Sequence, residues 1–420
     1  CKWVDSLVNL EKKKIGIVGA GIIGISSAIN LARRGCEVVL IDKDFKGQPA
    51  SYGNASWLSS PSITPVLMPG MIKKIPKLLF SKDGPLFLRF PGFLKIIPFL
   101  GKYLTYSKKE KVEHISKNLA FLLKDSIGEH RELAKETNAD KWIESSPFLF
   151  IYKNKDDFNS DNYTWALRKK HGFNLIEIKE DELKSLVPGL SSEFKFAIKI
   201  NDLGYISNSQ NYLDDLIEGF KKLGGNLIED QVIDIKDDNN KVNIVTKNNN
   251  LIVDEIIISS GIFSKKFSEK FGVSLPIESE RGYHLELFNT NVKLKYPIMN
   301  GYFKLAITPR PTGIRFAGLV EFGSLDSKPN PKAFELLMRN AKSMFPGIEF
   351  DRKQEWSGHR PSTVDSLPVI GKSSINEKVF FGYGHHHIGL TAGPKTGKML
   401  TKLILRDNDQ YDLNAFDPSR

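Results

Sequence analysis

The segment from Lys14 to Asp42 constrains the fold of this chain more than any other. It begins with an apolar, β-branched run at residues 15–18, which is typical of a buried parallel strand. Three glycines follow in the spacing G-x-G-x-x-G. The first allows a tight turn, the second lets the backbone approach a pyrophosphate, and the third lets a helix pack closely on the strand. A helical pattern and a second apolar strand complete a β-α-β unit, so the segment predicts a dinucleotide-binding α/β domain.

The same unit predicts the residues that hold the dinucleotide. Asp42 lies 23 residues after Gly19, where a carboxylate accepts hydrogen bonds from an adenosine ribose. An acidic residue there disfavours a 2'-phosphate, so FAD or NAD is favoured over NADP. The predicted binding residues of this unit are Gly19, Gly21, Ile22, Ile23, Gly24, Asp42 and Lys43.

Length and charge restrict the remaining possibilities. A chain of 420 residues exceeds one compact core, which predicts two domains or one interrupted domain. The formal net charge of +11 favours anionic partners such as acidic membrane surfaces or carboxylate substrates. No recognised nucleic-acid module is present, so we expect no nucleic-acid partner. The two cysteines provide no disulfide framework, and the absence of a signal peptide predicts a cytoplasmic protein.

The composition of two later segments indicates what they contact. Residues 48–56 form a polar, small-residue stretch in which Ser51, Asn54 and Ala55 suit a loop beside a cofactor, the alternative being an ordinary loop. In residues 65–105, apolar residues alternate with basic ones, and five prolines are expected to break any long helix. This composition predicts peripheral contact with the inner membrane. The alternative is a set of short helices that cap a substrate domain.

Periodicity predicts the other elements. Helices are expected at 110–139, within 160–189, and at 212–223, 332–344 and 389–405; strands are expected at 148–152, 231–235, 242–246, 251–253, 255–259, 280–290, 302–308, 314–319 and 379–381. The strands at 242–246 and 251–253 read as a hairpin.

Five blocks of the chain, in order, resemble the FAD-dependent D-amino-acid oxidase/dehydrogenase superfamily. They are KIGIVGAGIIGISSAINLARRG, VDEIIISSGIFS, ESERGYHLEL, WSGHRPSTVDSLPVIG and YGHHHIGLTAGPKTG. The resemblance runs from Lys14 to about Leu405 and is strongest to D-amino-acid dehydrogenases. It implies non-covalent FAD, held by the glycine turn and Asp42. It also places Val232 where relatives bond adenine through the backbone, and Ser260 and Gly261 against the cofactor.

The resemblance further implies that the C-terminal block lies at the flavin edge. A helix that begins after Gly389 carries unpaired N–H groups and a partial positive charge. Aimed at the pyrimidine edge of the flavin, it would stabilise the anionic reduced form. The predicted flavin-edge residues are Gly384, His385, Ile388, Gly389, Leu390 and Thr391.

Four residues are candidates for catalysis by the same resemblance. Arg360, in the Gly-x-Arg-Pro block, is implied to pair with the substrate carboxylate, which guanidinium geometry suits better than lysine does. Tyr302 lies where a family tyrosine lines the substrate pocket, although the partner expected four residues on is Ala306. Tyr283 and His284 follow an Arg-Gly turn that lies beside the isoalloxazine in relatives; core packing is the alternative.

The spacing of the histidines does not indicate a metal site. His386 and His387 belong to a run of three, but adjacent residues do not easily converge on one ion. No carboxylate or cysteine pattern joins them or His284. A histidine near the flavin would instead tune the protonation of the amine or the charge of the reduced flavin.

These inferences combine into one expected architecture. We expect an α/β protein with a discontinuous, Rossmann-like FAD domain and an α+β substrate domain built on an antiparallel sheet. The FAD domain comprises 1–60, 178–277 and 350–410, the substrate domain 61–177 and 278–349, and a C-terminal tail 411–420.

The expected reaction is oxidative deamination of D-amino acids to 2-oxo acids and ammonia, by hydride transfer to flavin. The small amino-acid substrate would pass its electrons to a quinone or another acceptor. The alternatives are an oxidase or dehydrogenase of glycine, sarcosine or D-hydroxyproline, a non-catalytic FAD subunit of an amine dehydrogenase complex, and an NAD-dependent dehydrogenase.

Overall fold

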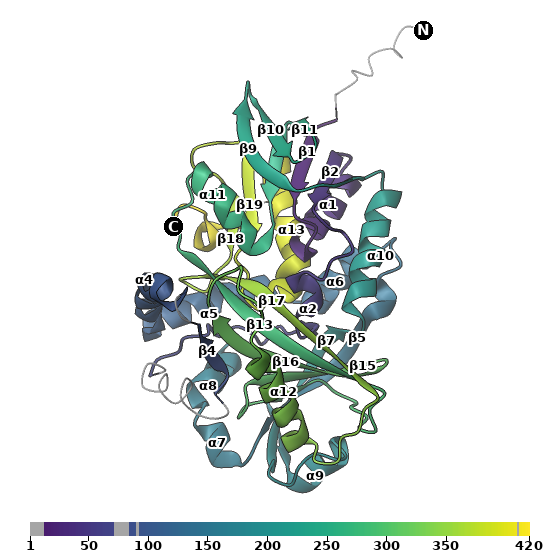
Figure 1. Ribbon diagram of the computed structural model, residues 1–420. Coiled ribbons are helices and arrows are strands. Elements are labelled where there is room, and N and C mark those ends of the chain that lie inside the picture. The colour runs from purple at the N-terminus through teal and green to yellow at the C-terminus, as the bar shows by residue number, and fades with distance from the viewer. Residues whose placement is uncertain (1–11, 71–83, 90–91, 410) are drawn as a thin grey trace.

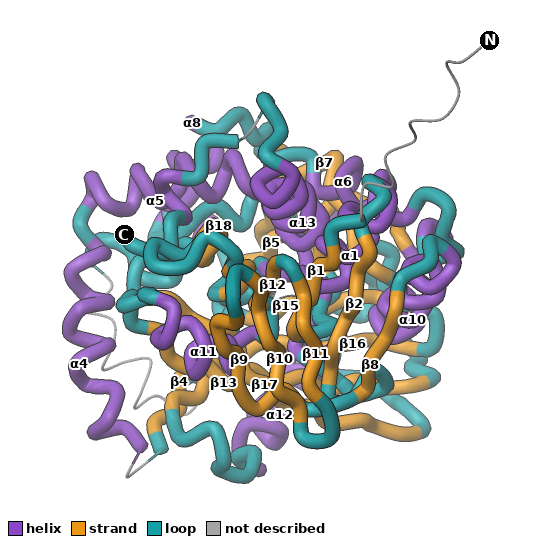
Figure 2. The backbone as a smooth tube through the Cα atoms, turned by 90° about the horizontal axis from the view of Figure 1, so that it is seen from above, coloured by secondary structure: helices purple, strands orange, loops and turns teal. Residues whose placement is uncertain are grey.

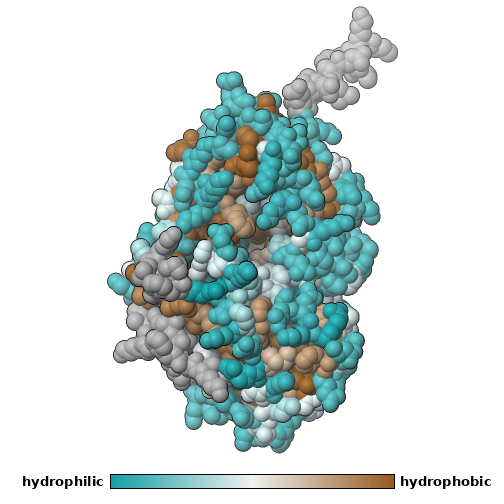
Figure 3. All heavy atoms as spheres, in the orientation of Figure 1, coloured by the Kyte–Doolittle hydropathy of each residue, from teal (hydrophilic) through white to brown (hydrophobic). Residues whose placement is uncertain are grey.

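The computed structural model describes residues 12–70, 84–89, 92–409 and 411–420 (Figure 1). Two large sheets, one in each half of the molecule, and a smaller three-stranded sheet organise the described chain. The upper half holds a mainly parallel sheet and the lower half a larger, mainly antiparallel one (Figure 1). This is the mixed α/β architecture that the sequence predicts. Hydrophilic side chains cover most of the face drawn in Figure 3, with apolar residues gathered in smaller areas.

The upper sheet has the strand order β18-β19-β12-β1-β2-β8. Its strands are β1 (Lys14–Val18), β2 (Glu37–Asp42), β8 (Asn226–Glu229), β12 (Glu255–Ile258), β18 (Val369–Lys372) and β19 (Val379–Tyr383). All neighbours run parallel except β18 and β19. The β-α-β unit at the N-terminus is therefore confirmed at the centre of this sheet.

Both faces of the upper sheet are covered, which is why residues 15–18 of β1 and 256–258 of β12 are apolar. Helices α1 (Ile22–Arg33), α10 (Ser209–Lys222) and α13 (Gly389–Leu405) bury Ile15, Ile17 and their neighbours on one face. Strands β9 (Val232–Asp238), β10 (Lys241–Thr246) and β11 (Asn250–Val253) bury Val18 and Val39 on the other. Seen from above, the α1 and α13 side and the β9–β11 side lie opposite each other (Figure 2).

The lower sheet has the order β17-β13-β16-β15-β14-β5-β7-β3, with β4 added beside β16 and β6 beside β7. Its strands are β3 (Trp57–Leu58), β4 (Leu86–Leu88), β5 (Ile143–Tyr152), β6 (Ile176–Lys179), β7 (Phe196–Ile206), β13 (Ile277–Phe288), β14 (Ile298–Asn300), β15 (Leu305–Arg310), β16 (Gly313–Phe322) and β17 (Arg352–Thr363). Helices α9 (Glu180–Leu186) and α12 (Pro331–Met344) pack on one face, and α7 (Lys155–Asn159) and α8 (Asn162–Lys170) on part of the other.

The predicted domain boundaries stay a prediction. Strands β3, β7 and β17 fall in ranges assigned to the FAD domain, and each of them pairs within the lower sheet.

Two further short helices are α2 (Ala50–Gly53) and α11 (Lys265–Ser268).

Three local predictions were wrong. The helix expected at 110–139 is two helices, α5 (Lys109–Leu123) and α6 (Ser126–Ala134), because Asp125 takes a left-handed conformation and accepts the N–H of Gly128 as an N-cap. Residues 160–189 hold two helices rather than one, separated by β6. The strand expected from residue 302 begins at Leu305, after a turn in which Asn300 accepts the N–H groups of Tyr302 and Phe303.

The basic, proline-rich segment 65–105 is described only in part, because residues 71–83 and 90–91 lie outside the described residues. Prolines do not prevent a helix here, since α4 (Gly92–Leu104) contains Pro98. The helix persists because Ile96, Phe99 and Tyr103 are buried against residues such as Phe322 and Val364. Across the described parts of the chain, no helix is long and apolar enough to cross a membrane. Contact of this segment with a membrane surface stays a prediction.

Candidate cofactor and substrate site

The glycine turn is shaped by close contacts on two of its three glycines. Gly19 has a φ of +102°, and a Cβ there would lie 2.7 Å from the Cα of Ser260. A Cβ on Gly24 would lie 1.9 Å from the carbonyl oxygen of Gly19, so α1 packs directly on the turn. On Gly21, by contrast, a Cβ would meet only the Oγ of Ser51, at 3.3 Å. Gly21 is therefore the position where this turn can receive a ligand.

Hydrogen bonds within the chain orient the start of α1 and the carboxylate of Asp42 near Gly21. Ser51 Oγ accepts the N–H of Ile22 at 3.0 Å, at the start of α1. Asp42 accepts the N–H of Ala20 at 2.7 Å and that of Asp44 at 3.1 Å, which orients its carboxylate at the end of β2. Both carboxylate oxygens keep lone pairs for further donors.

The other predicted ADP-side residues lie around the same edge of the sheet. The side chains of Ile22 and Ile23 are buried, so these two residues reach a ligand only through their backbone. Lys43 is exposed, with its Nζ 5.2 Å from the ring centre of Phe263. Gly261 follows β12 with a φ of +61°, and a Cβ there would meet nothing within 4 Å. Its neighbour Ser260 contacts Ser264 through their hydroxyls at 3.2 Å, and Val232 opens β9.

Hydrogen bonds connect the C-terminal block, residues 383–397, to the end of β17. His386 has a φ of +48°, and its N–H donates to the carbonyl of Pro361 at 3.1 Å. Its Nε2 accepts the N–H of Thr363 at 2.9 Å, and Ser362 and His385 form a β-bridge. Gly384 has a φ of +84°. These contacts bring the start of α13 next to the strand that carries Arg360.

The predicted flavin-edge residues are held in place on both sides. His385 Nε2 lies 3.0 Å from Thr396 Oγ1 within α13. Thr391 Oγ1 donates to the carbonyl of Trp57 at 3.0 Å, which joins α13 to β3. Ile388 and Leu390 are buried, and a Cβ on Gly389 would meet only His385, at 3.4 Å.

The side chain of Arg360, on β17, crosses the neighbouring strand β13 and contacts the next strand, β16. Its Nη1 donates to the carbonyl of Leu319 at 3.0 Å and its Nη2 to that of Gly318 at 3.5 Å, both on β16. The guanidinium passes over Gly282 of β13, where a Cβ would lie 2.2 Å from Nη2. A guanidinium has five N–H donors. These two bonds therefore leave donors for an incoming carboxylate.

The sequence predicted a turn at Arg281-Gly282, and this was wrong. Both residues lie inside β13, at a point where its register with β16 shifts between Arg281 and Tyr283. The bulge and the missing side chain of Gly282 together make room for the guanidinium of Arg360.

Charged and polar groups around Arg360 are buried. Glu280 is its direct partner across β13 and β17, and burial raises the pKa of Glu280 despite the opposing effect of Arg360. Burial lowers the pKa of Arg360, and the charge of Glu280 partly offsets this. Burial and then the charge of Arg360 lower the pKa of His387 to about 4. The histidine next to Arg360 is therefore neutral at pH 7.

A small cavity adjoins the C-terminal block and contains residues that sequence reasoning missed. It is lined by Ser62, Thr64, Pro65, Val66, Leu119, Ser366, His386, His387 and Ile388. His387 lines this cavity and is partly exposed to solvent. Because Nε2 of His386 accepts an N–H, its proton is on Nδ1, which is buried with no partner among the described residues. An unpaired buried donor in a cavity lining favours a ligand there.

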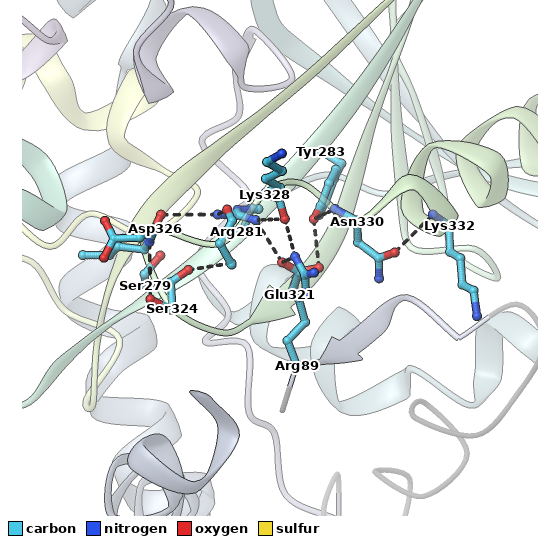
Figure 4. A network of polar contacts seen from close by, with 12 residues as sticks. Arg89, Ser279, Arg281, Tyr283, Glu321, Ser324, Asp326, Lys328, Asn330 and Lys332 are labelled. Atoms are coloured by element: carbon cyan, nitrogen blue, oxygen red, sulfur yellow. Dashed lines mark hydrogen bonds and ion pairs between the residues drawn. The ribbon is translucent and has the colours of Figure 1, made fainter. Parts of the chain in front are cut away.

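The network in Figure 4 connects β13 and β16, the two strands that the side chain of Arg360 contacts. The buried Arg281 donates to Glu321 at 3.1 Å and to the carbonyl of Lys328 at 2.9 Å (Figure 4). His359 lies between Arg281 and Ser279, at 3.3 Å and 2.7 Å. The sequence pattern gave no sign that these charged residues are buried, in contrast to the charged residues of the surface.

Among the described residues, no hydrogen bond joins the other three candidates for catalysis to Arg360. Tyr283 donates to Glu321 at 2.9 Å and packs against α12, while His284, next along the strand, points to the opposite face. There His284 donates from Nδ1 to the carbonyl of Gly53 at 2.8 Å and stacks on Trp356. Tyr302 is 48% exposed, with Lys153 Nζ 4.2 Å from its ring centre. A catalytic role for these three residues stays a prediction.

No group of three or more histidine, cysteine, aspartate or glutamate side chains that could hold a metal ion occurs among the residues described.

A buried histidine joins α6 to the start of α13 and predicts acid sensitivity. His130 donates from Nε2 to the carbonyl of Leu390 at 2.8 Å and accepts the hydroxyl of Tyr212 at 2.6 Å. Burial lowers its pKa from 6.5 to about 4. Above pH 6.5 both the folded and the unfolded states are neutral here. As the pH falls towards 4, the unfolded state takes up a proton that the folded state does not, so the free energy of unfolding falls, by up to about 3 kcal/mol.

Urea unfolding of the apoprotein between pH 7.5 and pH 4.5 tests this. The wild type should lose stability as the pH falls, and His130→Gln should lose less, because glutamine keeps a donor and an acceptor without titrating. Equal pH slopes in the two proteins would contradict the assignment.

Comparison with known proteins shows the family and the fold of this chain. The family described as FAD dependent oxidoreductase (DAO) matches residues 14–403. A D-amino-acid oxidase of Bradyrhizobium diazoefficiens is 34% identical over 418 residues, which cover 98% of this chain and 99% of that protein. A D-amino acid dehydrogenase of Neisseria gonorrhoeae is 25% identical, over 93% of this chain and 95% of that protein. Glycine oxidase from Geobacillus kaustophilus has a similar fold, with a TM-score of 0.74 and 20% identity, over 97% of this chain and 99% of that one.

Proposed function

Because the chain belongs to the DAO family of FAD-dependent oxidoreductases, we propose that it catalyses the oxidative deamination of D-amino acids to 2-oxo acids and ammonia. FAD is its cofactor, and the residues present fit that group. Gly21 leaves the glycine turn open, and Asp42 presents an oriented carboxylate at the end of β2. When bound there, FAD would supply an acceptor for the hydride of the substrate Cα.

One observation carries the choice of an amino-acid substrate: the placement of Arg360. Its guanidinium is held by two carbonyls of β16 beside the C-terminal block and keeps free donors for a carboxylate. A carboxylate so bound is fixed in position by paired, charge-assisted hydrogen bonds. The positive charge also lowers the pKa of a nearby substrate ammonium. This favours the neutral amine, whose lone pair assists hydride loss from Cα.

The neutral histidines support the same scheme. His386 and His387 line the cavity next to Arg360, and burial lowers the pKa of each, to about 3 and about 4. They add no charge that would repel an ammonium or compete for the carboxylate. The imino acid that forms hydrolyses with water to the 2-oxo acid and ammonia, which completes the reaction.

The electron acceptor defines two versions of this function. We propose a dehydrogenase that passes electrons to a quinone; the name dehydrogenase, given to the relative of Neisseria gonorrhoeae, supports an acceptor other than oxygen. The second version uses oxygen, and it is favoured by the 34% identity to a protein called an oxidase. Contact of residues 65–105 with the inner membrane would place the protein next to quinone.

Anaerobic bleaching of the bound flavin tests the substrate. Purified yellow protein is mixed with D- and L-amino acids, glycine, sarcosine and D-hydroxyproline while the flavin absorbance is followed. We expect rapid bleaching by D-amino acids alone. Bleaching only by sarcosine, glycine or D-hydroxyproline would contradict the proposal and favour the related amine-oxidising reactions. Failure of every compound would favour a non-catalytic FAD subunit.

The same preparation distinguishes the acceptors. The reduced protein is mixed with air-saturated buffer or, anaerobically, with a soluble quinone analogue. A dehydrogenase should be reoxidised rapidly by the quinone and slowly by oxygen, with little peroxide released. Rapid reoxidation in air with stoichiometric peroxide would assign it as an oxidase.

A further inference from the structure

The segment 52–56, called loop 52–56 here, comprises the last two residues of α2 and the three residues that follow, and side chains of the lower sheet bind its backbone. Arg315 Nη1 donates to the carbonyls of Tyr52 and Asn54, at 2.9 Å and 3.1 Å. Two further bonds hold the residues between: His284 Nδ1 lies 2.8 Å from the carbonyl of Gly53, and Thr308 Oγ1 lies 2.6 Å from that of Ala55. The carbonyl of Ser56 accepts the N–H of Ile206 at 2.7 Å. Five consecutive carbonyls are thus bound towards the lower sheet.

The N–H groups of this loop are used differently. Those of Tyr52 and Gly53 donate to Pro49, and that of Ser56 donates to Asn54 Oδ1 at 2.6 Å. Within the described chain, no hydrogen bond uses the N–H groups of Asn54 and Ala55. These two residues are among those predicted to lie at the flavin end of the cofactor site. The lower sheet therefore fixes a loop that keeps two backbone donors available.

The groups that hold the loop carry an excess of positive charge. Arg315 forms a close ion pair with Glu286 at 2.8 Å, and the Nε of Arg310 lies 3.6 Å from the other oxygen of the same carboxylate. Both arginine side chains are almost fully buried. His284 beside them is neutral, because burial and then the charge of Arg315 lower its pKa. Among the described residues, one carboxylate thus pairs with two guanidinium groups.

A buried charge that lacks a counter-ion acts strongly on its surroundings. Water screens it little, so its field reaches groups several ångströms away. The two arginines also contact the loop directly, since Arg310 Nη1 donates to Ser56 Oγ at 3.2 Å. The Nε of Arg310, although 3.6 Å from Glu286, and the Nε2 of His284 are buried and make no hydrogen bond in the described structure. Such a costly arrangement needs a compensating role.

We propose that Arg315, Arg310 and Glu286 are positioning residues of the cofactor site, which orient loop 52–56 and supply a buried positive charge that raises the reduction potential of bound FAD. The loop contacts set the geometry of the donors at Asn54 and Ala55. The uncompensated charge stabilises the negative charge that the flavin gains on two-electron reduction. The inference rests on FAD binding and on the predicted flavin-end position of the loop, and is independent of the substrate's identity.

Two variants that change the net charge of this cluster in opposite directions test the proposal. Arg310→Gln removes one positive charge, and Glu286→Gln removes the negative charge while its amide oxygen can still accept from Arg315. Both loosen the same cluster. The midpoint potential of bound FAD is measured against reference dyes during anaerobic photoreduction, so that no substrate is needed. The visible spectrum and the affinity for sulfite, which adds to electron-poor flavins, are recorded on the same samples.

We expect the potential to fall in Arg310→Gln and to rise in Glu286→Gln. A tenfold change in the reduction equilibrium in each direction, about 30 mV for a two-electron couple, is the size expected. Sulfite affinity should change in the same sense. Arg315→Lys should nearly keep the potential while shifting the flavin absorbance maxima, because lysine keeps the charge and loses the paired carbonyl contacts.

The matched control is Arg352→Gln, which removes an exposed arginine from β17 of the same sheet, where it stacks on Phe288. Its potential and spectrum should equal those of the wild type. Shifts in the same direction for both cluster variants, or unchanged potentials with FAD bound, would overturn the proposal. If Glu286→Gln does not fold, Arg310→Gln and Arg315→Lys suffice: equal potentials in these two variants would equally overturn it.

Discussion

Replacing Arg360 with methionine should raise the KM for an amino-acid substrate about 100- to 1000-fold. The substitution keeps most of the side-chain length and removes the donors that face the carboxylate. Two hydrogen bonds to a charged group contribute about 3–4 kcal/mol together, which corresponds to this range. FAD should stay bound, because Arg360 bonds to β16 and makes no contact with the glycine turn.

Steady-state kinetics and a flavin absorbance titration measure the two effects separately. Arg360→Lys should be intermediate, since an ammonium keeps the charge and loses the paired geometry. Gly282→Ala should reproduce part of the loss without changing any ligand-binding group, because a Cβ there would lie 2.2 Å from the guanidinium.

An amino-acid amide, which has no carboxylate, provides the internal control. Wild type and Arg360→Met should oxidise it with similar, low efficiency. Unchanged KM values for the free amino acid in Arg360→Met would remove the basis for the proposed function, and the further inference about the lower sheet would be unaffected.

Gly24→Ala should abolish FAD binding and destabilise the apoprotein, whereas Gly21→Ala should affect FAD binding alone. A Cβ on Gly24 would lie 1.9 Å from the Gly19 carbonyl, so α1 would have to move away from the turn. Overpacking of a close backbone contact costs about 1–3 kcal/mol or more. On Gly21 the new methyl group meets only a serine hydroxyl at 3.3 Å and otherwise occupies the ligand's side of the turn.

Thermal unfolding of the two apoproteins, followed by FAD titration, checks this pair. The apoprotein of Gly21→Ala should melt close to the wild type and bind FAD at least tenfold more weakly. That of Gly24→Ala should melt several degrees lower. If the two apoproteins were equally stable, the turn would not be set by the packing of α1, and the assignment of separate roles to the two glycines would fail.

The part of the site that sequence predicts best is local. The glycine turn, the end of β2 and the start of α13 each depend on residues within a few positions of one another. Glycine spacing and apolar periodicity carry that information directly. The mixed α/β architecture followed from a resemblance that spans nearly the whole chain. The family match over 14–403 confirms the resemblance, and the similar fold of glycine oxidase confirms the architecture.

What sequence did not predict depends on contacts between distant segments. The bonds of Arg315 to the carbonyls of Tyr52 and Asn54 span more than 250 residues, and a pattern along the chain contains no sign of them. One signal was present and unused. Adjacent strand residues point to opposite faces, so Tyr283 and His284 in a strand could not both face one pocket.

The bonds that hold loop 52–56 from the lower sheet also bear on how the protein acquires its cofactor. The loop is ordered by the protein's own side chains, so its conformational entropy is lost when the chain folds and not when FAD arrives. Association should then be limited mainly by encounter, with little waiting for rearrangement. An apoprotein of this kind can persist as a folded reservoir when flavin is scarce and return to the active pool as soon as the supply recovers.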